Sequence, residues 1–170
     1  MAKGVGTVLL VRSLDFDIGV VVLAGLAATC GQMWPVFKGF DGEKGNTTGF
    51  GAALALAPLP TLLALIPVLL AIFSKAVKAF RLKNVPRDQR FKTGAGHRAA
   101  LPIGVLVAFA VLPLLSVLFD EPDAVALGFA ALFVLVIVRR LTAGLSQDLA
   151  SGAPRGKIFW SRFLLDRPVL

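Results

Sequence analysis

The residues best suited to chemistry lie in one glycine-rich stretch, residues 31–49, between two apolar runs. Five glycines, two lysines, two acids and three aromatic residues share its nineteen positions. Glycine adopts positive φ and lets the backbone approach a ligand closely, and adjacent backbone N–H groups together with a lysine hold anions. A helix expected to restart at about Thr48 would add the positive end of its dipole. The stretch therefore indicates a phosphate-binding loop at a membrane surface, with a charged flexible turn as the alternative.

The composition places these residues in a membrane protein. Hydrophobic residues make up 56% of the chain and charged residues only 16%, whereas a soluble domain is about 45–50% apolar. The formal net charge is +8, and the basic residues gather between apolar runs. That arrangement favours membrane topology and contact with anionic lipid headgroups over nucleic-acid binding. We expect one all-α integral membrane domain over residues 1–170, with membrane lipids and no nucleic acid among its partners.

Two single residues exclude whole classes of site. Cys30 is the only cysteine and His97 the only histidine, so the chain forms no internal disulfide and no histidine-rich metal site. We expect neither a metal nor another cofactor. His97 is interpreted as a solvated loop histidine beside Arg98.

The apolar runs predict a polytopic helix bundle of about five transmembrane passes. Residues 18–34, 101–119 and 124–138 each indicate one pass. Residues 1–14 are too short to cross a bilayer and are interpreted as a partial N-terminal helix. In residues 144–170, basic and aromatic side chains are interleaved, a pattern typical of a helix that lies at the membrane interface.

Residues 50–81 allow either one long helix or two passes. Pro58 and Pro60 break the helical hydrogen-bond ladder, which favours a short pass to about Leu59 and a second pass from Pro60 to about Arg81. The short pass is only about 18 Å long, less than the roughly 30 Å bilayer core. Two passes put the glycine-rich loop beside the basic residues 75–98, on the cytoplasmic side by the positive-inside rule. A cysteine at Gly42 should then be labelled only from the cytoplasm.

The stretch from Gly31 to Gly45 resembles the second signature of the bacterial acyl-phosphate:glycerol-3-phosphate acyltransferases. The chain has GQMWPVFKGFDGEKG where that signature is G-H-x-F-P-V-F-x-x-F-x-G-G-K-G. A small/Thr-Gly run follows in both, here residues 46–51. The Lys3-Gly4 step and the break at Ala57-Pro58 also resemble the family, as do Arg140, Leu141 and Gly144 of a third signature.

The resemblance implies a multi-spanning fold in the inner (plasma) membrane with its active site at the cytoplasmic face. It implies transfer of an acyl group from acyl phosphate to the 1-hydroxyl of glycerol 3-phosphate, giving lysophosphatidic acid without a metal or a covalent enzyme intermediate. Positioning and charge stabilisation would supply most of the catalysis. The catalytic residues that it implies are Gln32, Lys44 and Arg140. The phosphate-binding residues that it implies are Gly42, Lys44, Gly45, Asn46 and Thr47.

The chain departs from the family pattern at several polar positions. Gln32 stands where the family has histidine, and Glu43 stands where it has glycine. Ile137 and Ser146 stand where it has asparagine and glutamate. Glutamine forms hydrogen bonds but is a poor general base. A catalytically reduced homologue that binds lipid or a partner subunit is therefore the second hypothesis. A small channel or transporter is the third, although no ionisable residue lies well inside a predicted pass.

The family's first signature, a Gly-Ser-Gly-Asn loop, does not occur in these residues. The chain opens within an apolar element, and the resemblance begins at Lys3. We therefore expect that Met1 is not the natural start, and that an in-frame upstream region codes for about 35–50 residues with one span and such a loop. A nearby in-frame stop codon would contradict this expectation.

Overall fold

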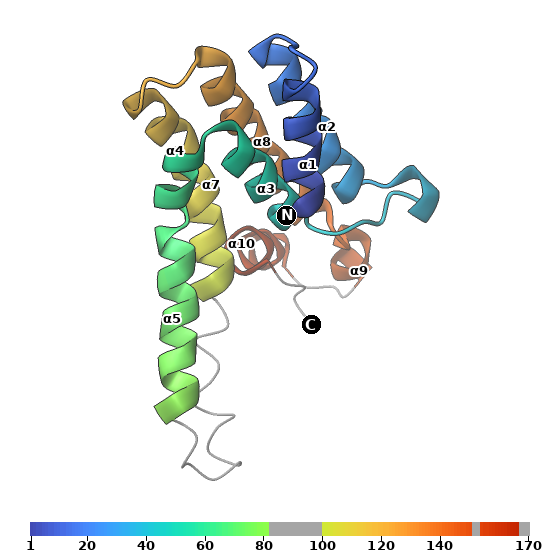
Figure 1. Cartoon of the computed structure of the whole chain (residues 1–170). Helices are drawn as coiled ribbons and strands as arrows, with labels where there is room; N and C mark the ends of the chain where they lie inside the picture. The colour runs from blue at the N-terminus through green and yellow to red at the C-terminus, as the bar shows by residue number, and fades with distance from the viewer. Residues whose placement is uncertain (82–99, 151–153, 167–170) are drawn as a thin grey trace.

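The computed structural model describes residues 1–81, 100–150 and 154–166, and in these ranges every element is a helix (Figure 1). The helices are α1 (Ala2–Arg12), α2 (Ile18–Met33), the 3-10 helix η1 (Val36–Lys38), α3 (Asn46–Leu56), α4 (Pro58–Ala64), α5 (Ile66–Arg81), α7 (Ala100–Leu118), α8 (Asp123–Thr142), α9 (Leu145–Ala150) and α10 (Arg155–Leu165). The predicted all-α class is confirmed for the described ranges.

Three helical stretches of the described chain are long and apolar enough to cross a membrane. They are Ile18–Lys38, Ala100–Leu118 and Asp123–Thr142. Their outward faces carry large exposed apolar side chains such as Leu23, Leu114 and Leu127. Such side chains on several neighbouring helices match lipid better than water. The protein is therefore a helical membrane protein.

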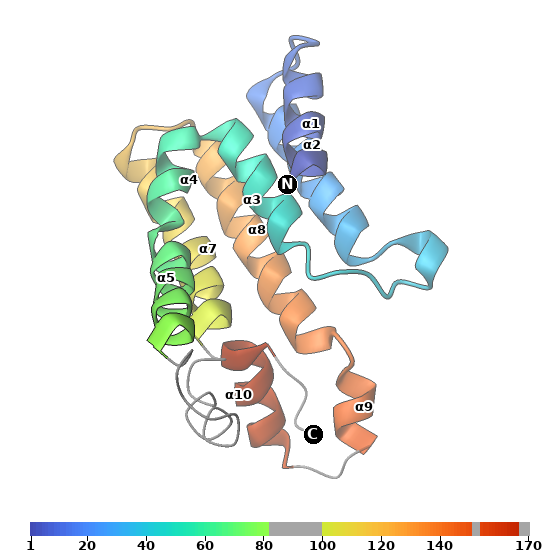
Figure 2. The ribbon, with the colours of Figure 1, turned by 60° about the horizontal axis from the view of Figure 1, so that its bottom comes forward.

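The chain reverses direction between α3 and α4. Ala57 leaves the helical region, with φ −140° and ψ 89°, and Pro58 begins the next helix, where proline's missing N–H costs nothing. Figures 1 and 2 show α3 running to one end of the bundle and α4 and α5 returning beside α7. The predicted break at the prolines is confirmed. A further break at Leu65, before Pro67, was not predicted, and the same proline chemistry accounts for it.

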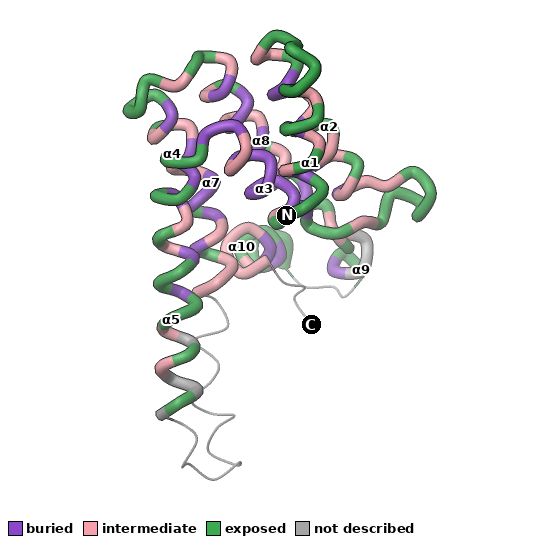
Figure 3. Tube along the Cα trace, in the orientation of Figure 1, coloured by how far each residue is buried: buried purple, intermediate pink, exposed green. Residues whose placement is uncertain are grey.

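The core lies where α1, α2, α7 and α8 surround α3, and the buried residues in Figure 3 follow these contacts. Phe50 of α3 stacks on Phe109 of α7, with ring centroids 4.1 Å apart. The α1 helix packs against the α3 backbone at Gly4, where a Cβ would lie 2.1 Å from the Thr48 carbonyl oxygen. Only glycine allows this approach, so the predicted partial helix is a packed part of the bundle.

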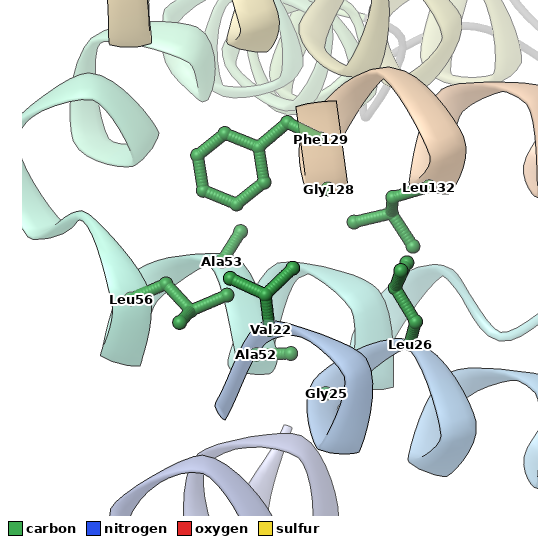
Figure 4. A pocket seen from close by; sticks show the side chains of 9 residues that line it. All are labelled: Val22, Gly25, Leu26, Ala52, Ala53, Leu56, Gly128, Phe129 and Leu132. Atoms are coloured by element: carbon green, nitrogen blue, oxygen red, sulfur yellow. The ribbon is translucent and has the colours of Figure 1, made fainter. Parts of the chain in front are cut away.

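A small cavity lies in this core, between α2, α3 and α8 (Figure 4). It holds about 10 Å³, roughly the space of one water molecule. Its lining is Val22, Gly25, Leu26, Ala52, Ala53, Leu56, Gly128, Phe129 and Leu132. A water needs polar partners, which these side chains do not provide, so this cavity is a packing gap and no binding site.

The C-terminal part differs from the predicted boundaries. The α8 helix continues to Thr142, beyond the predicted end of this pass at residue 138, so Arg139 and Arg140 lie inside it. The tail forms two helices, of which α10 exposes Phe159 and Trp160 and buries Ile158. Such an amphipathic surface is in keeping with the predicted interfacial helix. The remaining predicted basic residues, 82–98 with His97, lie outside the described residues.

Candidate active site

The glycine-rich loop folds back on the end of α2. The Glu43 backbone N–H donates to the Gln32 carbonyl oxygen over 3.2 Å. At Gly42 a Cβ would lie 2.3 Å from Pro35 Cδ and 2.4 Å from the Gln32 carbonyl oxygen. Gly45 has φ +70° and begins α3 as its N-cap. Both glycines are therefore required by the path of the backbone, one by space and the other by its dihedral angle.

This path creates an open hollow of about 500 Å³ at the start of α3. The lining residues are Asp41, Gly42, Glu43, Lys44, Gly45, Asn46, Thr47, Arg139 and Ala143. All five residues predicted to bind phosphate are among them. The first backbone N–H groups of a helix have no intrahelical partner, and in the described part of the chain no side chain caps this turn of α3. The hollow therefore offers N–H donors and the positive end of a helix dipole to an anion.

Arg139 of α8 holds the loop from the side of the bundle. Its side chain is only 7% exposed. Its Nη2 donates to the Gly42 carbonyl oxygen and, over 3.3 Å, to Asp41 Oδ1, while its Nε lies 3.4 Å from the Glu43 carbonyl oxygen. Its guanidinium carbon lies 6.0 Å from the centre of the Trp34 ring, a cation–π distance. One buried side chain thus fixes three consecutive residues of the loop.

Lys44 reaches across the site to the end of α10. Its Nζ lies 2.6 Å from Asp166 Oδ2 and 3.2 Å from the Asp166 carbonyl oxygen. The Lys44 side chain is 52% exposed, and the Asp166 side chain is 10% exposed. The cation of the loop is therefore positioned at the hollow, with a carboxylate as its present partner.

The α10 helix is held in place by buried contacts of its own. Arg162 pairs with Asp148 of α9 over 2.6 Å, and it also donates to the carbonyl oxygens of Ala143 and Gly144. Both charged side chains are buried, and removing one partner of such a pair is costly. The position of Asp166 beside the loop is therefore built into the packing of the tail.

The other two predicted site residues lie outside the lining of the hollow. Gln32 lies in the last turn of α2, and its Oε1 accepts a 3.0 Å hydrogen bond from Lys3 Nζ. Arg140 points to a different face of α8, where it donates to the carbonyl oxygens of Pro102 and Phe163. The structure thus brings the predicted loop residues together and adds Arg139 to them, whereas Arg140 joins α7 and α10.

Asn46 also lines this hollow. Its Oδ1 is buried and has no hydrogen-bond partner in residues 1–81, 100–150 and 154–166. An unpaired buried acceptor is costly unless a ligand or water supplies a donor. Lys44, the N–H groups of α3 and Asn46 together suit a ligand that carries both a phosphate and hydroxyl groups.

Comparison with known proteins agrees with this chemistry. The family model described as "Glycerol-3-phosphate acyltransferase" matches residues 1–145. "Glycerol-3-phosphate acyltransferase 4" of Dehalococcoides mccartyi strain CBDB1 is 31% identical over 175 residues, which cover 99% of this chain and 65% of that protein. "Glycerol-3-phosphate acyltransferase" of Neisseria gonorrhoeae strain NCCP11945 is 31% identical over 142 residues, which cover 81% of this chain and 60% of that protein.

A shorter match is closer in sequence. "Glycerol-3-phosphate acyltransferase" of Rubrobacter xylanophilus is 50% identical over 58 residues, which cover 34% of this chain and 29% of that protein. The chain spans less than two thirds of the length of each of these relatives. No solved structure matches the chain. Because the family model covers most of its length, the chain belongs to the glycerol-3-phosphate acyltransferase family.

Proposed function

We propose that the protein transfers an acyl group from acyl phosphate to the 1-hydroxyl of glycerol 3-phosphate and so makes lysophosphatidic acid for phospholipid synthesis. The observation that carries this proposal is the hollow at the start of α3, which is lined by Lys44 and the loop backbone. The relatives' names supply the acceptor. The family resemblance of the loop supplies the acyl-phosphate donor.

In this proposal the phosphate of glycerol 3-phosphate lies at the N-terminus of α3. Lys44 and the free N–H groups of the helix pair with its charge, and Asn46 Oδ1 accepts a hydrogen bond from a hydroxyl group. The 1-hydroxyl oxygen attacks the acyl carbonyl carbon, and the bond from that carbon to the phosphate oxygen breaks. The products are the ester and hydrogen phosphate, which carries away the hydroxyl proton.

The roles that we propose for the site residues follow from the negative charge of the two substrates. Acyl phosphate brings a second anion, so fixed cations and N–H donors contribute more than a strong base. Gln32 is proposed to orient a hydroxyl group from the end of α2, because its amide donates and accepts hydrogen bonds but does not take a proton. Arg139 acts through the loop that it holds. We propose Arg140 as the residue that positions α7 and α10 around the site.

A transfer assay tests this function. Purified protein in lipid vesicles receives labelled glycerol 3-phosphate and either an acyl phosphate or the matching acyl thioester. We expect labelled lysophosphatidic acid with the acyl phosphate and little with the thioester. Equal product from both donors would contradict the proposed donor, and no product from either would contradict the activity.

We infer five passes in the inner membrane, formed by α2, α3, α4 with α5, α7 and α8, with the loop on the cytoplasmic side. The contact between the loop and Arg139 puts the loop at the same end as the C-terminus of α8. The end of α5 lies there too (Figure 1), and it carries the first basic residues of the basic segment. The positive-inside rule assigns this end to the cytoplasm.

Thiol labelling tests this orientation. A cysteine at Gly42 would clash with Pro35 and Gln32, so the position to use is Phe37, which is 101% exposed in η1. In a Cys30→Ser background, Phe37→Cys should react with an impermeant reagent only in inverted vesicles. Leu14→Cys, at the α1–α2 turn, is the matched control and should react only in intact cells. The reverse pattern would contradict the inferred orientation.

A further inference from the structure

Lys44 has a carboxylate partner, Asp166, that lies outside the residues matched by the family model. That model ends at residue 145, and Asp166 follows α10. The pair joins residues 122 positions apart. Since Lys44 also contacts the Asp166 carbonyl oxygen at 3.2 Å, its ammonium group bonds to two oxygens of one residue.

The backbone of Asp166 presents these two oxygens together. Asp166 is the C-cap of α10 in the left-handed region, with φ 52°, which aspartate adopts more readily than most residues. Its N–H donates to the Arg162 carbonyl oxygen over 3.1 Å. The C-terminal end of a helix carries partial negative charge. Lys44 thus faces a carboxylate and the negative end of α10 at the same point.

A phosphate in the hollow competes with this arrangement. The Lys44 ammonium lies within 2.6 Å of the carboxylate, so its charge is already compensated. A dianionic phosphate has a stronger attraction to the ammonium than a single carboxylate. The α10 helix is anchored separately by the pair of Arg162 and Asp148, so its position does not depend on the contact between Lys44 and Asp166.

We propose that Asp166 is the resident counterion of Lys44, that glycerol 3-phosphate binds by displacing its carboxylate, and that Asp166 thereby sets the affinity of the site for phosphate. Asp166 is a positioning residue that acts through Lys44. It keeps the ammonium group at the hollow until phosphate binds, and it disfavours ligands whose charge is too low to replace a carboxylate. This inference rests on the proposed function of the hollow.

Equilibrium binding of labelled glycerol 3-phosphate to the full chain in lipid nanodiscs tests this role. Asp166→Asn keeps an oxygen acceptor and removes the charge. We expect it to bind about fivefold more tightly, the ratio that corresponds to about 1 kcal/mol for a partly exposed ion pair. The KM for glycerol 3-phosphate should fall by a similar factor. Asp166→Glu should keep wild-type affinity.

The matched control is Asp120→Asn at the α7–α8 turn. Asp120 has the same left-handed backbone, with φ 52°. The turn between α7 and α8, to which it belongs, lies at the opposite end of these helices from α10 (Figure 1). The substitution should leave the affinity unchanged, so a general effect of net charge is separated from a local one. Unchanged or weaker binding by Asp166→Asn would overturn the counterion role, because a merely structural contact would be lost without any gain in affinity.

Measurements of binding and of acyl transfer distinguish the proposed function from the counterion role of Asp166. If acyl transfer occurs and Asp166→Asn does not bind more tightly, the counterion role fails and the proposed function stands. If tighter binding is seen without transfer, the proposed function fails and the counterion role stands. If wild type shows no binding that depends on Lys44, both fail.

Discussion

Lys44→Ala should lower acyl transfer by about a hundredfold or more, the size of the loss when one charge-stabilising donor is removed from an active site. Lys44 is the lysine side chain that lines the hollow at the start of α3. Without its charge, a phosphate there would face Asp41 and Glu43 with the helix terminus and Arg139 to hold it, and Arg139 is already bonded to the loop. The measurement is kcat/KM for glycerol 3-phosphate in the transfer assay.

Lys38→Ala is the matched control, because it removes the same charge from the same loop. Lys38 ends η1 and does not line the hollow, so we expect less than about a threefold change, in line with the small effects of exposed charges. Lys44→Arg should also lose activity, since a planar guanidinium does not replace an ammonium in a shaped site. Equal, small effects of the two alanine substitutions would mean that the loop is only a charged turn.

Arg139→Ala should have the second-largest effect, through the shape of the loop. The substitution leaves the Gly42 and Glu43 carbonyl oxygens without their donor and opens space under the Trp34 ring. We expect unfolding to become easier by about 2–4 kcal/mol and the KM for glycerol 3-phosphate to rise at least about tenfold. Denaturant titration in detergent and the transfer assay measure the two effects.

The substitution Arg140→Ala distinguishes an effect on the loop from an effect on the packing of the bundle. It removes the buried arginine next to Arg139, whose hydrogen bonds go to the carbonyl oxygens of Pro102 and Phe163 and not to the loop. We expect a similar loss of stability with a smaller rise in KM. A larger rise in KM for Arg140→Ala than for Arg139→Ala would show that Arg140 acts on the substrate directly, in line with the catalytic role that the family resemblance implies.

The sequence predicts the helical class, the long passes and the break at Ala57-Pro58, because hydrophobic runs and prolines act locally. It also indicates the loop, since glycine and lysine at those positions carry their own chemistry. The resemblance to the family selects Arg140 rather than Arg139 as a site residue, because a signature is matched by the positions of its residues along the chain. Adjacent residues of a helix point about 100° apart, so the packing of α8 decides which arginine faces the loop.

Contacts between distant residues could not be predicted in the same way. Asp166 is one acid in a basic tail, and only the packing of α10 brings it to Lys44. Gly4 resembles a short family motif, but the sequence does not show that its missing Cβ admits the Thr48 carbonyl oxygen. Both contacts depend on how whole helices meet, which the spacing of apolar residues leaves undetermined.

The shortness of α3 has a consequence for how the protein is made. Its 11 residues extend about 16 Å, roughly half of a bilayer core. A helix of this length does not partition into lipid alone, because its ends would leave backbone groups without partners in hydrocarbon. During synthesis, we therefore expect α3 to enter the bilayer only together with protein partners, above all α1 and α2, which precede it in the chain and pack against it. The loop proposed to bind phosphate then acquires its final shape only when α8 has been made and Arg139 reaches it.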